Sequence, residues 1–282
     1  MKKWLNFSFA AFLALSGLLM QSSLQSAETN APHKVEPRTA KKQSMAIPAY
    51  FYPTAENLPL WEQLRSGHPA VSIAIATGLG LEGTTPDPNY QAQMTKTRKA
   101  GIRGLAYVTT SYGAKELTKA LKEIDNAFAW YDIDGIFFDE AVPYPVTTAQ
   151  VSYHAAMHKY VKSKNRGAIT VINHGQILPE EYAAVCDIMM NAEMGYESYL
   201  KEWSPWGWES RYPASKFWHI IHSVDTVEKM QHALKLSKER NARYVFVTSS
   251  TMESPGGPYG TLPSSEYWSA EIAAISAKKP AK

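Results

Sequence analysis

The sequence predicts a single (β/α)8 TIM barrel. Eight apolar, strand-like runs alternate with helix-like stretches over roughly 235 residues, and barrels of this class usually contain about 250. The composition agrees, because 45% of the 282 residues are hydrophobic and 20% are charged, which is ordinary for one large globular core. A doubly wound open sheet is the alternative fold, but it seldom contains eight strands in one run.

Apolar runs that end at turn residues mark the first four strands. These strands are expected at 46–52, 71–76, 102–109 and 135–138. Pro53 ends the first run, a glycine-rich loop follows the second, and Ser111, Tyr112 and Gly113 follow the third. The helices that accompany these strands are expected at 58–66, 89–99, 115–130 and 148–164.

The last four strands are expected at 168–173, 187–192, 217–222 and 244–248, with helices at 227–240 and 265–277. The fifth strand leads through His174 and Gly175 to a polar segment, and Glu193 comes directly after the sixth. Cys186 is the only cysteine. It lies where the sixth strand begins, so we expect a small buried hydrophobic residue rather than a nucleophile.

The first 44 residues lack the alternating strand and helix patterns of the rest of the chain. Two lysines precede an apolar run at 7–20, which is shorter than the ~20 residues needed to span a bilayer and is typical of a secretory signal peptide. We therefore expect a signal peptide at 1–27, a disordered leader at 28–44 and the barrel at 45–282. The mature protein is then secreted or periplasmic, not attached to a membrane, and is expected to be a monomer.

Net charge argues against nucleic-acid binding. The chain carries a formal net charge of +3, but this excess comes from the signal peptide and the leader. The remaining domain is nearly neutral and lacks the basic footprint that nucleic-acid binding needs.

The strand ends supply a set of carboxylates, aromatic rings and amides. In a (β/α)8 barrel these ends meet at one mouth, where active sites lie. The candidates, in chain order, are Tyr52, Tyr107, Tyr112, Asp139, Glu140, Asn173, His174, Glu193, His222 and Tyr259. Carboxyl groups for glycosidic chemistry, flat rings for sugar faces and amides for hydroxyls make this a predicted sugar site.

Glycoside hydrolysis needs one carboxylic acid and one carboxylate on opposite sides of the bond that is cleaved. Asp139 and Glu140 are sequence neighbours whose side chains should diverge, so Glu193 is the better partner for Asp139. We expect Asp139 to act as nucleophile or charge stabiliser, Glu193 as acid/base, and Glu140 as a substrate-binding or pKa-setting neighbour. Pairing of these acids with lysines at a rim is the alternative.

The segment 203–212 is unusually rich in tryptophan and includes Trp206. It is either a stacking platform for sugars, with Trp206 in contact with substrate, or a hydrophobic plug on the barrel. The sequence leaves both interpretations open.

No metal or cofactor is expected. His154 and His158 have metal-ligand spacing but lack the zincin glutamate, and their helix should place them on the outer surface. The glycines at 256–257 match no phosphate-binding motif, and no Gly-x-Ser-x-Gly segment is present.

Five segments carry a family resemblance, at 47–53, 86–90, 107–113, 134–140 and 258–263. The most specific is Asp-Gly-Ile-Phe-Phe-Asp-Glu at 134–140, together with the Tyr-Gly segment at 259–260. The chain resembles the spherulin-4-like family, a group that includes a glycoside hydrolase family of microbial endo-α-1,4-galactosaminidases.

That resemblance implies a barrel that cleaves α-1,4 linkages in a partly deacetylated, N-acetylgalactosamine-containing exopolysaccharide of a biofilm matrix. It also implies that acids matching Asp139, Glu140 and Glu193 line the cleft. Two features depart from the family pattern: the Met-Met-Asn-Ala segment before Glu193, and the tryptophan-rich insertion after it. A catalytically silent polysaccharide-binding barrel, a glycosidase for a different α-linked sugar and a structural envelope or spore-coat protein are the competing interpretations.

Overall fold

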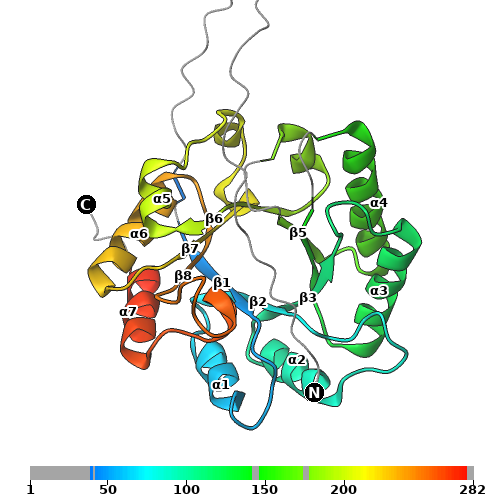
Figure 1. Cartoon of the computed structure of the whole chain (residues 1–282), viewed down its shortest axis with the longest axis horizontal. Helices are drawn as coiled ribbons and strands as arrows, with labels where there is room; N and C mark the ends of the chain where they lie inside the picture. Colours follow the sequence, from blue (N-terminus) through cyan, green and yellow to red (C-terminus); the bar gives the residue numbers. More distant parts are fainter. Residues whose placement is uncertain (1–38, 41, 142–145, 174–177, 278–282) are drawn as a thin grey trace, which may run out of the picture. The chain divides into compact units, whose positions relative to one another are not determined.

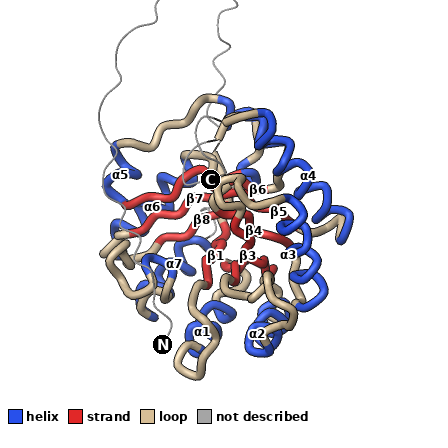
Figure 2. The backbone as a smooth tube through the Cα atoms, turned by 45° about the vertical axis from the view of Figure 1, so that its right-hand side comes forward, coloured by secondary structure: helices blue, strands red, loops and turns tan. Residues whose placement is uncertain are grey.

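The computed structural model describes residues 39–40, 42–141, 146–173 and 178–277. In this part of the chain eight parallel strands form one closed barrel, in which each strand pairs with its sequence neighbours and β8 pairs with β1. This arrangement confirms the predicted (β/α)8 fold. Helices surround the ring of strands in Figure 1, and Figure 2 shows the strands gathered at the centre with helices outside them.

The strands are β1 (Ser44–Ala49), β2 (Val71–Ala76), β3 (Arg103–Thr109), β4 (Gly135–Asp139), β5 (Ile169–Asn173), β6 (Ile188–Gly195), β7 (Phe217–His222) and β8 (Tyr244–Val247). The α-helices are α1 (Leu58–Ser66), α2 (Pro88–Lys99), α3 (Leu117–Trp130), α4 (Thr148–Lys164), α5 (Tyr196–Lys201), α6 (Val227–Glu239) and α7 (Ser265–Ser276). Short 3-10 helices are η1 (Glu180–Ala184), η2 (Trp208–Arg211), η3 (Ala214–Lys216) and η4 (Gly257–Tyr259).

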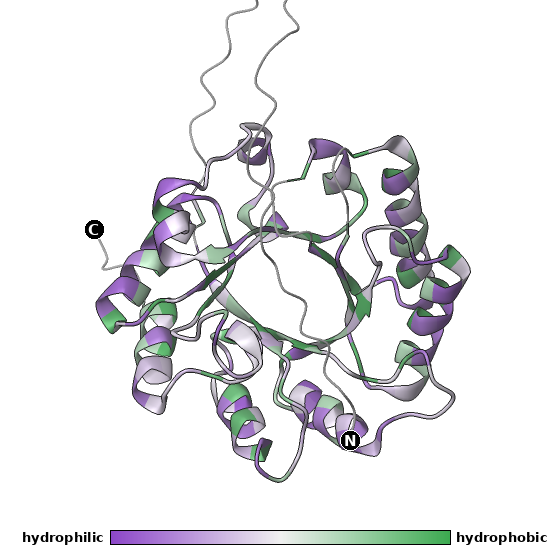
Figure 3. Cartoon of the chain, in the orientation of Figure 1, coloured by the Kyte–Doolittle hydropathy of each residue, from purple (hydrophilic) through white to green (hydrophobic). Residues whose placement is uncertain are grey.

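The strands are apolar because both of their faces are covered, by the barrel interior on one side and by helices on the other. Every residue of β1 and β5 is buried. Figure 3 shows hydrophobic residues concentrated on the strands and hydrophilic ones on the helices. Continuous apolar runs are therefore a reliable guide to these strands.

Helix starts follow local capping chemistry. Asp87 caps α2 by accepting hydrogen bonds from the backbone N–H groups of Asn89 and Tyr90, and Pro88 occupies the first turn. Thr147 and Gln150 form a capping box at the start of α4. Such caps satisfy backbone N–H groups that have no partner inside the helix.

A glycine sets the spacing between β4 and β5. A Cβ atom at Gly135 would lie only 2.0 Å from the backbone carbonyl oxygen of Ile169, so no larger residue fits there. From Gly135 and Ile169 the two strands stay paired up to Phe138 and Ile172. Asp139 and Asn173, the last residues of these two strands, are neighbours as a result.

The largest differences from the predicted strand boundaries lie in β1 and β6. Ser44, which the sequence assigns to the leader, begins β1 and pairs with Tyr244 of β8, and pairing with β2 ends at Ala49 rather than reaching Tyr52. Strand β6 continues through Glu193 to Gly195, after an irregularity between Met190 and Ala192.

Two histidines lie differently from the prediction. His154 is 1% exposed and its Nδ1 bonds the carbonyl oxygen of Gln150. His158 bonds the hydroxyl of Thr170 on β5. The prediction of two surface histidines was wrong, because the face of α4 that carries them packs against the barrel: His154 is buried and His158 is half-buried.

Cys186 is buried, as predicted, and burial raises the pKa of its thiol to about 12. Within the described ranges, no helix combines the length and the apolar character required to cross a membrane. The same residues contain no group of three His, Cys, Asp or Glu side chains that could hold a metal ion.

Candidate active site

A pocket of about 240 Å³ opens at the carboxyl ends of the strands. Its lining comes from the ends of β1, β3, β4, β5, β6 and β8 and consists of Tyr50, Tyr112, Asp139, Glu140, Asn173, Glu193 and Tyr259. Three of these residues are acids, three are tyrosines, and none is a lysine or an arginine. The pocket is therefore acidic, with aromatic walls, and the rim pairing of its acids with lysines is not what the described residues show.

Asp139 is the last residue of β4 and accepts two side-chain hydrogen bonds. The hydroxyl of Tyr107 donates to Oδ2 at 2.6 Å, and Nδ2 of Asn173 donates to Oδ1 at 2.7 Å. Burial raises the pKa of the Asp139 carboxyl, and these donors, together with the backbone N–H of Glu140, oppose that rise. The donors favour the ionised form that a nucleophile needs.

Glu193 projects into the pocket from β6. The hydroxyl of Tyr259 donates to Oε1 at 2.5 Å, and Nδ2 of Asn173 donates to Oε2 at 3.0 Å. Burial raises the pKa of Glu193, the two donors lower it, and the negative charge of Asp139 raises it further. Because Glu193 has fewer donors than Asp139, it is the better holder of a proton.

Asn173 connects the two acids. One nitrogen atom, Nδ2, lies 2.7 Å from an oxygen of Asp139 and 3.0 Å from an oxygen of Glu193. The nearest oxygens of the two carboxyl groups can therefore be no further apart than the sum of these distances. Both carboxyl groups face the same small pocket, which is the arrangement that two-carboxylate chemistry requires.

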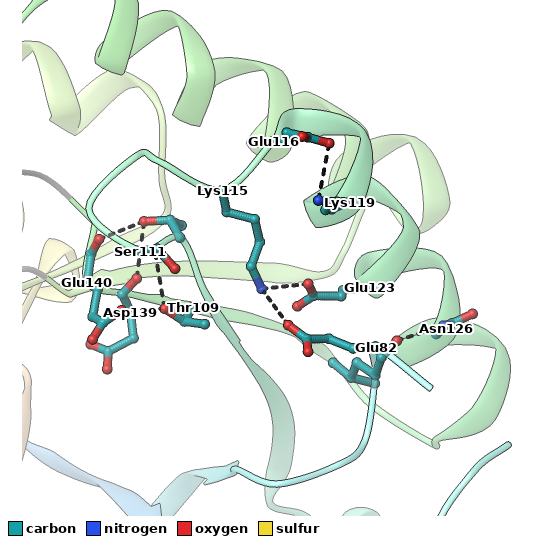
Figure 4. Close-up of polar contacts among 12 residues, drawn as sticks. Glu82, Thr109, Ser111, Lys115, Glu116, Lys119, Glu123, Asn126, Asp139 and Glu140 are labelled. Carbon is teal, nitrogen blue, oxygen red and sulfur yellow. Dashed lines mark hydrogen bonds and ion pairs between the residues drawn. The ribbon is translucent and has the colours of Figure 1, made fainter. Parts of the chain in front are cut away.

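Glu140 diverges from Asp139, as predicted for sequence neighbours. Its backbone has a positive φ of 49°, which is uncommon for a residue with a side chain. Its carboxylate accepts a 2.6 Å hydrogen bond from the hydroxyl of Thr109, and its carbonyl oxygen accepts bonds from the hydroxyl of Thr110 and the N–H of Tyr112. Figure 4 shows Thr109 and Ser111 beside the two acids. The loop after β3 thus holds Glu140 at the pocket wall.

The sequence model of spherulation-specific family 4 matches residues 44–275. This chain belongs to that family. The match covers the whole barrel, including every strand and all the pocket acids, and it confirms the resemblance found in the sequence.

Two known proteins are similar to this family 4 barrel over much of its length. Spherulin-4 of Physarum polycephalum is 28% identical over 190 residues, which are 64% of this chain and 56% of that protein. The chain thus spans about half the length of this curated relative. Sph3 of Aspergillus clavatus, solved in complex with GalNAc, superposes with a TM-score of 0.71 at 21% identity, over 87% of this chain and 100% of that one.

More distant barrels share the fold alone. A chitinase from Bacteroides thetaiotaomicron gives a TM-score of 0.51 at 11% identity, over 83% of this chain and 96% of its own. Alpha-L-fucosidase isoenzyme 2 from Paenibacillus thiaminolyticus gives 0.50 at 13% identity, over 83% and 49%. The architecture is therefore one that glycosidases also use.

Several predicted site residues of the family 4 barrel lie outside the pocket. Tyr52 is 40% exposed, and its hydroxyl is bonded to Asp87 and Asn89 at the start of α2. It was expected at a strand end, but β1 stops at Ala49 and the chain has turned away by Tyr52. His222 does end β7, beside Gly195, yet its Nδ1 bonds Ser223 rather than a pocket residue. His174 lies outside the described residues.

The tryptophan-rich segment packs at the opposite end of the barrel. Trp208 contacts Phe217, where β7 begins, and the carbonyl oxygen of Glu209 accepts a hydrogen bond from Asn241, just before β8. Trp206 is 53% exposed, and its backbone N–H donates to Oε1 of Glu209. These contacts favour the plug over the platform and place Trp206 away from the pocket, which corrects its assignment as a substrate-binding residue.

Sequence reasoning missed Tyr50. It follows β1 directly and lines the pocket, with its ring edge-to-face against Tyr107 at 5.8 Å and Tyr259 at 5.5 Å between centroids. The apolar run in the sequence continues to Pro53 and therefore predicts Tyr52 as the terminal residue of the strand. Two tyrosines in the segment 50–52 were the available signal, and the true end of pairing with β2 decides between them.

Proposed function

We propose that this family 4 barrel is a glycoside hydrolase that uses Asp139 and Glu193 as its two carboxylates. The observation that carries the proposal is the shared hydrogen bonding to Asn173, which turns both acids toward one pocket. Asp139 acts as the nucleophile, because three donors stabilise its charge. Glu193 acts as the general acid, because burial and the charge of Asp139 favour its protonated form.

The spacing favours a retaining mechanism. The distances to Asn173 limit the gap between the nearest carboxyl oxygens, and such a gap suits the roughly 5–5.5 Å of retaining enzymes better than the roughly 6.5–9.5 Å that leaves room for water in inverting ones. Asp139 then attacks the anomeric carbon while Glu193 protonates the departing oxygen. Deprotonated Glu193 then takes a proton from a water molecule, whose oxygen attacks the anomeric carbon and breaks the bond between that carbon and Asp139.

The charge of the pocket supports an amino sugar as substrate. Three acids and no basic residue occur among the described lining residues, so a cationic, partly deacetylated polymer is attracted to the pocket. The similar protein Sph3 was solved with GalNAc. We therefore propose endo-acting cleavage of α-1,4 linkages in a galactosamine- and N-acetylgalactosamine-containing matrix exopolysaccharide, by a monomeric protein exported through its signal peptide.

Release of reducing ends tests the proposal. The protein from Glu28 onward is incubated with galactosamine-based and glucosamine-based polymers of defined acetylation, beside Asp139→Asn and Glu193→Gln. Truncation at Met45 is avoided, because Gln43 bonds Ser237 and Ser44 belongs to β1. We expect cleavage of a galactosamine polymer by the parent and a loss of at least roughly 10³-fold in both variants.

The same assay separates the alternatives. Saturable polymer binding without new reducing ends indicates a silent binding barrel. Cleavage of another α-linked polymer keeps the two-carboxylate mechanism and changes the sugar. Activity that survives both substitutions, with unchanged circular dichroism, contradicts the proposed mechanism.

A further inference from the structure

Three tyrosines pack beside the two acids, with the ring of Tyr50 edge-to-face against the rings of Tyr107 and Tyr259. Tyr107 donates to Asp139 and Tyr259 donates to Glu193. Tyr50 lies between them, in ring contact with both. Its own hydroxyl makes no hydrogen bond to any residue in the described part of the chain, although it lines the same pocket.

Packing alone does not account for this hydroxyl. The two ring contacts fix the orientation of the Tyr50 side chain, and a phenylalanine would make the same contacts. Tyr50 is half-buried and its hydroxyl lines the open pocket, so a bound ligand can replace the water that solvates it. Around it, the oxygens of Asp139 and Glu193 already accept bonds from Tyr107, Asn173 and Tyr259. Among the described residues, the Tyr50 hydroxyl is therefore a donor that remains available.

The electrostatic setting keeps this donor protonated. Burial and the nearby charges of Asp139 and Glu193 raise the pKa of the Tyr50 phenol well above its ordinary value. Throughout the range in which the acids titrate, Tyr50 can donate a proton into a hydrogen bond but does not become a phenolate. It cannot replace Glu193 as the acid, and its role is limited to hydrogen bonding.

We propose that the Tyr50 hydroxyl donates a hydrogen bond to an oxygen of the sugar held between Asp139 and Glu193, and that Tyr50 is a catalytic residue of the glycosidase proposed above, on which this inference rests. The ligand class is a pyranose with an acceptor oxygen, either a hydroxyl or an acetamido carbonyl, on the side that faces Tyr50. Such bonds contribute to catalysis when they strengthen in the transition state.

Tyr50→Phe tests this role with little risk to folding, because no hydrogen bond within the described protein is lost. We expect kcat/KM on the cleaved polymer to fall roughly ten- to 100-fold. The pH profile should keep its shape, and the urea midpoint of unfolding should match that of the parent.

Tyr107→Phe is the matched control, since it removes a hydroxyl that does bond an acid. Loss of the Tyr107 donor should raise the pKa of Asp139 and so move the acidic limb of the pH profile to higher pH. Tyr50→Phe should not move that limb. Unchanged kcat/KM in Tyr50→Phe overturns this inference and leaves the proposed function intact. A shifted pH limb in Tyr50→Phe also overturns it, since that result assigns Tyr50 to positioning an acid. No cleavage of any polymer by the parent protein overturns the proposed function and this inference together.

Discussion

At the residue scale, a single hydrogen bond from Tyr259 acts on the pKa of Glu193. Its hydroxyl donates to Oε1 at 2.5 Å, and this bond lowers the pKa of the glutamate against the effect of burial. The opposite oxygen, Oε2, already accepts a hydrogen bond from Asn173. A phenol from the loop after β8, far from Glu193 in sequence, thus lowers the pKa that burial raises.

Tyr259→Phe should raise the pKa of Glu193, because the carboxylate loses its donor. In the proposed mechanism Glu193 must be protonated for the first step, so the basic limb of the kcat/KM profile should move to higher pH. A pH–rate series on the cleaved polymer measures this shift. Movement of the acidic limb alone would assign the proton to Asp139 and contradict Glu193 as the general acid.

At the scale of elements, the loop between β3 and α3 positions the acids. Its backbone N–H groups at Thr110 and Tyr112 donate to the carbonyl oxygens of Asp139 and Glu140. The loop ends at Lys115, whose ammonium group pairs with Glu123 at 2.5 Å and with Glu82 at 3.3 Å (Figure 4). The helix was predicted to begin at Lys115. It begins at Leu117 because Lys115 closes the loop, its N–H bonding the carbonyl of Thr110.

Lys115→Met should therefore weaken both stability and activity. The Lys115 and Glu123 side chains are 9% and 7% exposed, and removing one partner of a buried pair costs on the order of 3 kcal/mol. Lys119→Met is the control, because Lys119 and Glu116 are 68% and 67% exposed and such pairs contribute less than about 1 kcal/mol. Urea unfolding and polymer turnover measure the two effects. Equal, small losses in both variants would show that Lys115 does not anchor the loop.

At the scale of the whole molecule, the barrel is closed by the pairing of β8 with β1, and this pairing is short. Among the residues that the structure describes, only Ser44 with Tyr244 and Met45 with Val245 are paired between these two strands. Beyond them, the N–H of Val247 donates to Oε1 of Glu271 on α7. Glu271 is fully buried, and burial raises the pKa of its carboxyl to about 8. A helix thus supplies the acceptor that the neighbouring strand does not.

This carboxyl makes stability depend on pH. Above its ordinary pKa of 4.5, Glu271 loses its proton in the unfolded chain but keeps it in the folded protein up to about pH 8. Folding binds a proton within this window, so the free energy of unfolding falls as pH rises, by about 1.4 kcal/mol for each unit. Glu271→Gln should remove that slope and stabilise the protein at pH 8. Glu266→Gln, on the exposed side of α7, should leave it. Urea unfolding at pH 5, 6.5 and 8 measures the slope of the unfolding free energy against pH. The same slope in both variants would contradict the argument that buried Glu271 causes it.

The sequence predicted the barrel and its acids because these depend on local pattern. Buried strands form apolar runs that can be recognised without knowing how the helices pack. The run at 135–138, for example, ends at Asp139. The positions of Tyr50 and Trp206 could not be predicted in this way, because they depend on contacts between distant parts of the chain. Where β1 stops is set by its pairing with β2, and the path of the tryptophan-rich segment is set by contacts with Phe217 and Asn241. Such long-range contacts have no signature in a single sequence.

The anomeric configuration of the first product tests the central claim most directly. The claim is that Asp139 and Glu193, joined through Asn173, face each other closely enough for direct attack on the sugar. Proton NMR during early turnover of an α-linked galactosamine polymer should show the α-anomer appearing first, followed by slow mutarotation. Initial release of the β-anomer would show that water attacks instead, and it would contradict Asp139 as the nucleophile.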